Sequence, residues 1–101
     1  MTIRLGIVVT HGAAQPHAVG LAQAAARRGW PCRCFLTDGG VRLLASAPLL
    51  ELARAGAIRL DVCEHSWQLH GGGGEIPAGA NRGGQYQNAE LAHQCDRVVV
   101  L

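Results

Sequence analysis

The chain has 101 residues, of which 49% are hydrophobic and 16% are charged, and its formal net charge at pH 7 is +2. This length fits one domain with one hydrophobic core, so we expect a single domain over residues 1–101. The nine basic residues are scattered along the sequence, which argues against a nucleic-acid partner. No run reaches the roughly 18 apolar residues that span a bilayer, so we expect no membrane partner.

The first half of the chain alternates apolar runs with helix-like stretches. Residues 3–10 predict a strand, and we expect no signal peptide there because no small-residue cleavage site follows. The alanine-rich stretch after it predicts a helix, with Pro16 in its first turn and Gly29 as its C-terminal cap. After a second apolar run at 32–37, the pattern predicts two short helices or one helix that is kinked at Pro48.

The second half adds two more apolar runs, at residues 58–63 and 97–101, and between them lies a glycine-rich stretch. Residues 71–84 contain seven glycines and predict a long loop ahead of a last helix. Loops of this length are usually functional or disordered. The order of the segments predicts an α/β fold, a small three-layer arrangement with a parallel sheet of about four to five strands flanked by helices. The high apolar fraction also predicts a homo-oligomer or hetero-oligomer.

Polar residues follow three of the predicted strands. The three segments are Thr10-His11-Gly12, Thr37-Asp38-Gly39-Gly40 and Cys63-Glu64-His65-Ser66. The carboxyl ends of parallel strands share one edge of the sheet, here called the carboxyl edge, and ligands bind in the crevice outside it. We therefore expect a site at this edge.

Cys63 has two interpretations from its position. As a nucleophile, it would stand at the start of a short helix, where backbone N–H groups favour the thiolate, and His65 or His70 would add positive charge. As a structural residue, it would be the last inward-facing residue of a strand, since free cysteines are often buried. Position alone leaves the two interpretations open.

The other cysteines favour structural roles. Cys32 and Cys34 are two apart on a strand and share one face, which is typical of buried small residues. Cys95 follows the last helix, as a packing residue or, alternatively, a resolving thiol. Paired zinc ligands such as C-x-x-C are missing from the sequence, so we expect no metal, and no other cofactor is required. Four cysteines without need of disulfides are typical of the cytoplasm.

The order of several short segments resembles the DsrE/DsrF-like family, which includes the TusB, TusC and TusD sulfur-relay subunits. The segments are the stretch Phe-Leu-Thr-Asp-Gly-Gly-Val at 35–41, Leu-Ala-Arg-Ala-Gly at 52–56, the third strand that ends in Cys63, Gly-Gln-Tyr-Gln at 84–87, and Cys-Asp-Arg-Val-Val-Val at 95–100. The resemblance covers nearly the whole chain, so we expect a single DsrE/DsrF-like domain.

The resemblance implies a cytoplasmic sulfur carrier or sulfurtransferase, in which Cys63 would hold sulfur as a persulfide and exchange it with a donor and with a TusA-like carrier protein. Family members commonly form homo- or hetero-oligomers. Supporting roles then fall to His65, His70 and Arg82, with His11 and Asp38 at the same edge. The glycine-rich loop would act as a mobile flap beside Cys63. Two alternatives remain: a non-catalytic binding or assembly module in which Cys63 is buried, and a metal site built from Cys63, His65 and His70.

Overall fold

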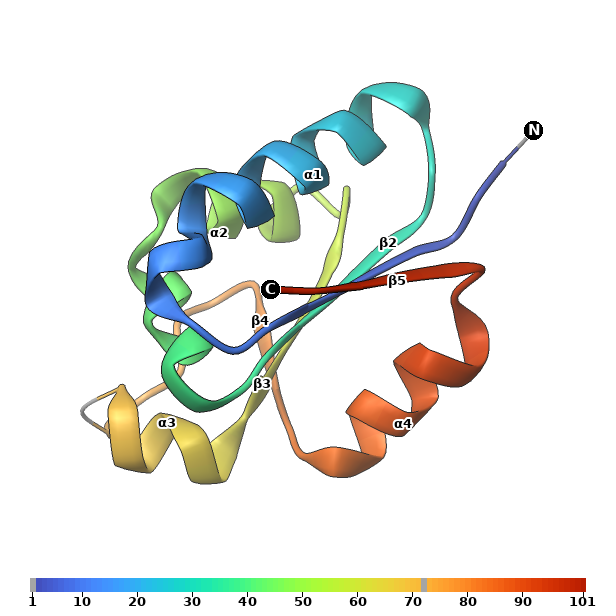
Figure 1. Cartoon of the computed structure of the whole chain (residues 1–101). Coiled ribbons are helices and arrows are strands. Elements are labelled where there is room, and N and C mark those ends of the chain that lie inside the picture. The colour runs from blue at the N-terminus through green and yellow to red at the C-terminus, as the bar shows by residue number, and fades with distance from the viewer. Residues whose placement is uncertain (1, 72) are drawn as a thin grey trace.

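The computed structural model describes residues 2–71 and 73–101, and Figure 1 shows helices on both sides of a central sheet. The described residues form five strands, in the spatial order β4-β3-β2-β1-β5, and every neighbouring pair is parallel. The strands are β1 (Leu5–Val9), β2 (Cys32–Leu36), β3 (Arg59–Cys63), β4 (Ala80–Gly83) and β5 (Arg97–Val100). The predicted α/β class and parallel sheet are confirmed.

The helices follow the predicted pattern. In chain order they are the 3₁₀ helix η1 (Gly12–Ala14), α1 (Gln15–Arg28), the 3₁₀ helix η2 (Asp38–Ala45), α2 (Ala47–Arg54), α3 (Glu64–His70) and α4 (Gln85–Gln94). Gly29 caps α1 in the left-handed region, at φ 70°, as its position predicts. The segment around Pro48 forms two helices, because Ser46 is extended and Pro48 lies in the first turn of α2.

The strand β4 lies inside the stretch that we expected to be a long loop. Ala80–Gly83 has no apolar run, since its sequence is Ala-Asn-Arg-Gly, and no hydrophobic pattern marks it as a strand. It forms because its backbone pairs with the edge of β3, in the register Leu60 with Ala80 through Cys63 with Gly83. The loop prediction is therefore wrong for these four residues.

The two faces of the sheet are covered unequally. Helices α1 and α2 lie on one face and enclose the larger part of the core (Figure 1). The other face carries α4, beneath which a separate small cluster of buried residues forms from Val8, Phe35, Cys63 and Leu91. The side chains of β1, β2 and β3 alternate between the two faces, so alternate residues of each strand point to α4.

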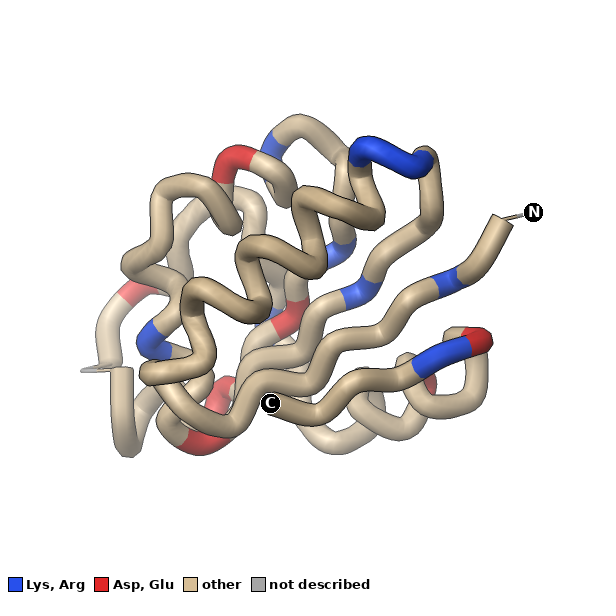
Figure 2. Tube along the Cα trace, turned by 45° about the horizontal axis from the view of Figure 1, so that its top comes forward, with Lys and Arg blue, Asp and Glu red and all other residues tan. Residues whose placement is uncertain are grey.

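Charged residues are distributed over several strands and helices and are not gathered on one element (Figure 2). At the β5 edge, Val98 and Val100 are exposed beside α4. None of the helices formed by residues 2–71 and 73–101 is long and apolar enough to cross a membrane.

Candidate functional site

The ends of β1, β2 and β3 meet at the carboxyl edge, as the sequence predicts. The N–H of Asp38, just after β2, donates to Oγ of Ser66 in α3 at 2.9 Å. Gly39 lies against the end of β1, where a Cβ built on it would be 3.3 Å from the carbonyl oxygen of Thr10. Asp38 itself adopts φ 48°, in the left-handed region.

Cys63 is the last residue of β3 and the residue that precedes α3, so its predicted place in the chain is correct. Of the two interpretations of its side chain, the buried one describes its position. The residue is 6% exposed and packs with Val8, Phe35 and Leu91 under α4. The sequence left this open, because the helix that covers the thiol comes from a segment more than 20 residues further along the chain.

The side chain of Arg82 does not lie on the face of Cys63. Arg82 pairs in register with Val62 on β3, and the alternation of strand side chains directs it to the opposite face of the sheet. Its Nε is 3.6 Å from Oε1 of Glu64, so its charge is balanced by that carboxylate. Arg82 is therefore not placed to stabilise a thiolate at Cys63.

The candidate histidines are exposed and do not gather around the thiol. His65 lies in the first turn of α3, and His11 follows β1 at the same edge. His70 ends α3, seven residues after Cys63, which is roughly 10 Å along a helix. There it lines a cavity of about 270 Å³ together with Arg42, Leu44, Ala45, Trp67 and Gly71.

The described glycines of the 71–74 run lie at the far end of α3. Nε1 of Trp67 donates to the carbonyl oxygen of Gly74 at 3.1 Å, and the Trp67 ring lies against Gly71. Residue 72 falls outside the described residues. Gly71, Gly73 and Gly74 therefore do not lie over Cys63 as a flap; α4 takes that place.

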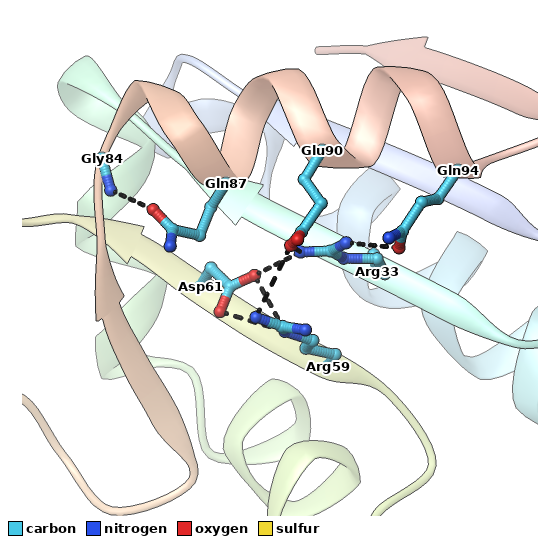
Figure 3. Close-up of polar contacts among 7 residues, drawn as sticks. All are labelled: Arg33, Arg59, Asp61, Gly84, Gln87, Glu90 and Gln94. Carbon is cyan, nitrogen blue, oxygen red and sulfur yellow. Dashed lines mark hydrogen bonds and ion pairs between the residues drawn. The ribbon is translucent and has the colours of Figure 1, made fainter.

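A buried charge cluster lies under α4, and the sequence interpretation missed it. NH2 of Arg33 is 3.2 Å from Oδ2 of Asp61 and 2.9 Å from Oε1 of Glu90, and NH1 donates to Oε1 of Gln94 at 2.8 Å. Arg59 completes the cluster, with Nε 3.2 Å from Oδ2 of Asp61 (Figure 3). The sequence did contain a signal for this cluster, because Arg33 and Asp61 are charged residues inside otherwise apolar strands.

The cluster is neutral, since two guanidinium groups face two carboxylates. Arg33 is 9% exposed and Asp61 is 2% exposed. Burial acts to lower the pKa of Arg33, but hydrogen bonds to Glu90 and Asp61 outweigh it and raise that pKa. Within residues 2–71 and 73–101, Nε of Arg33 has no hydrogen-bond partner.

The remaining cysteines occupy different settings. Cys32 and Cys34 are buried on the face covered by α1 and α2, as their spacing predicts. Burial raises the pKa of Cys32 to about 11, and burial raises the pKa of Cys34 as well. Cys95 is half-buried after α4; burial raises the pKa of its thiol, and the charges of Arg33 and Arg4 act in the other direction.

The ligand set suggested for a metal does not assemble. Among the described residues, no group of three or more His, Cys, Asp and Glu side chains is arranged to hold a metal ion. The set of Cys63, His65 and His70 is therefore not supported by the geometry. At the carboxyl edge, Cys63 ends β3 and is the N-cap residue of α3, and its thiol makes no capping hydrogen bond to that helix, whose residues are all described.

Comparisons with known proteins place the fold but not the activity. No family model and no curated protein matches the chain. The crystal structure of the ychN protein from E. coli matches over 100% of both chains, with a TM-score of 0.72 and 14% sequence identity. At this identity the likeness establishes the fold alone, and it supports the DsrE-like fold that the sequence resemblance implies.

Proposed function

We propose that this chain is a sulfur carrier or sulfurtransferase that holds sulfane sulfur as a persulfide on Cys63. The observation that carries the proposal is the position of this thiol. Of the four cysteines, all of which are described, Cys63 is the one at the carboxyl edge, where three strand ends meet. Cys32 and Cys34 lie within β2 under the main core, and Cys95 lies before β5 at the opposite edge.

The proposed transfer follows the rules of thiol–disulfide exchange. The Cys63 thiolate attacks the outer sulfur of a donor persulfide, a new S–S bond forms at Cys63, and the donor leaves as a thiolate. In the second step an acceptor thiolate attacks the outer sulfur, and Cys63 leaves as a thiolate. Neither step needs an external oxidant or reductant, and neither needs a cofactor.

The proposed partners are proteins. A donor persulfide and an acceptor thiol on a TusA-like carrier would approach the carboxyl edge in the reducing cytoplasm, where the four thiols stay free. We also propose an oligomer, because Val98 and Val100 leave an apolar strip exposed at the β5 edge.

One specific observation favours a second candidate function. The low exposure of Cys63 and its packing with Phe35 and Leu91 suit a binding or assembly module of this fold in which the thiol is structural. The two candidates differ in a measurable property, which is whether the native protein accepts sulfur at this residue.

The test is incubation of the native protein with a persulfide donor, followed by mass spectrometry of the intact chain and of its peptides. We expect the mass of one added sulfur on the Cys63 peptide, and its loss in Cys63→Ser. Cys95→Ser serves as the matched control and should retain the adduct. Absence of any adduct on Cys63, or labelling of Cys32 or Cys95 alone, would favour the assembly module.

A further inference from the structure

We propose that α4 covers Cys63 and moves aside to admit a reactant. The contacts of Arg33 with Glu90 and Gln94, here called the polar latch, hold the helix to the sheet. This proposal rests on the proposed role of Cys63, because a carrier thiol must meet two partners. The structure places that thiol under α4, so the contacts between α4 and the sheet control access to it.

Helix α4 itself buries little apolar surface against the sheet. Of its ten residues, all of them described, Leu91 is the one that is buried. The cluster on this face contains Leu91 and three buried residues of the sheet, whereas the core on the opposite face continues across α1, α2 and η2. Moving α4 would uncover Leu91 and the sheet residues Val8, Phe35 and Cys63, but it leaves the larger core on the opposite face covered.

Polar contacts also hold α4 to the sheet, and water can replace them when the helix moves. Arg33 donates to Oε1 of Glu90 at 2.9 Å and to Oε1 of Gln94 at 2.8 Å, and both acceptors lie in α4 (Figure 3). Glu90 and Gln94 lie at the outer side of the cluster, where water can replace the contacts when the helix moves. Asp61 stays on the sheet and keeps both Arg33 and Arg59 as partners. Opening leaves Arg33 and Arg59 with Asp61 alone, and the positive charge that Glu90 no longer balances then faces water, which lowers the cost of its exposure.

The connections at the two ends of α4 differ. After the helix, Asp96 is fixed to Arg4, whose N–H donates to Oδ2 of Asp96 at 2.8 Å. Before the helix the chain passes through Gly83, which ends β4, and Gly84, whose N–H donates to Oε1 of Gln87 within α4 at 2.8 Å (Figure 3); neither glycine has a side chain that restricts the backbone. Gly83 pairs in register with Cys63. The start of α4, which follows the two glycines, is therefore the end of the helix that adjoins the thiol.

The test is the rate at which iodoacetamide alkylates Cys63 in the native protein, measured by peptide mass spectrometry. Cys34 is fully buried on the other face and reports global unfolding in the same sample. Glu90→Gln removes the charged contact of the latch, and we expect about tenfold faster alkylation of Cys63 with no change at Cys34. Glu51→Gln, the same change on the exposed face of α2, should leave both rates unchanged.

Equal alkylation rates at Cys63 and Cys34, or no effect of Glu90→Gln on Cys63, would overturn the proposal. If Glu90→Gln does not fold, amide hydrogen exchange of the wild-type chain decides. We expect α4 to exchange faster than α1, and equal exchange in the two helices would show that no separate opening exists. Alkylation requires no sulfur transfer, so rapid opening without a persulfide adduct would refute the proposed function alone.

Discussion

The charge cluster under α4 allows a quantitative test of what holds this face together. Arg33→Met keeps a side chain of similar length but removes one guanidinium, which leaves Arg59 to balance both Asp61 and Glu90. Asp61→Leu removes the buried carboxylate and leaves two guanidinium groups with Glu90 alone. Each single substitution therefore leaves one unbalanced charge beneath α4.

The expected cost follows from burial. Removing one partner of a buried ion pair typically costs about 3–5 kcal/mol. The Arg59 side chain is 50% exposed and that of Glu90 is 25% exposed, so water screens part of the imbalance and the lower figure applies. We expect each single variant to lose about 3 kcal/mol, a large fraction of the roughly 5–15 kcal/mol that stabilises a domain of this size.

The double variant should lose much less than the sum. With Arg33 and Asp61 both removed, Arg59 and Glu90 remain as a balanced pair, 3.8 Å apart. Replacing both members of a buried pair by apolar residues is often nearly neutral. Two single losses of about 3 kcal/mol each, with a nearly neutral double variant, give a coupling energy of up to about 6 kcal/mol, which urea unfolding followed by the fluorescence of Trp30 and Trp67 would measure. Losses that add to within about 0.5 kcal/mol would refute the view that charge balance, and not packing, matters here.

Two further predictions concern packing and pH. In Gly6→Ala the new Cβ would lie 2.6 Å from Cδ2 of Leu91, so we expect the free energy of unfolding in urea to fall by about 1–3 kcal/mol. Gly20→Ala, with open space around the new Cβ, should be neutral or stabilising. Similar losses of stability in both variants would contradict this prediction. Burial raises the pKa of Cys32 from 9.0 to about 11, so the unfolded chain releases this proton first and stability falls as pH rises between these values. The free energy of unfolding falls by about 1.4 kcal/mol at pH 10 because of Cys32, with a similar loss from Cys34. Cys32→Ala should remove the part of the pH dependence that Cys32 causes. An unchanged pH dependence in that variant would contradict the assignment to Cys32.

The main elements could be predicted because their signals are local. Proline in the first turn and glycine at the C-terminal cap define α1, and short apolar runs define β1, β2, β3 and β5. β4 has no such signal. Its four residues become a strand through backbone hydrogen bonds to β3, an interaction that depends on what lies beside them and not on their side chains.

The candidate site could be predicted in part. The convergence of three strand ends follows from the parallel sheet, and the place of Cys63 at the end of β3 follows from the length of an apolar run. The charge cluster was not foreseen, although Arg33 and Asp61 stand at inward positions of apolar strands. A lone charge inside a strand indicates that a partner is needed, but the partner's identity requires the register between β2 and β3 and the position of α4.

The sequence by itself determined the α/β class, the order of most elements and the edge at which Cys63 lies, because these follow from periodicity, turn residues and the rule that parallel strands end together. Only the tertiary structure decided that the thiol is covered, that Arg82 faces away from it, and that Arg33 joins the sheet to α4. These facts depend on contacts between segments far apart in the chain, and such contacts are set by how the layers pack and not by any local pattern.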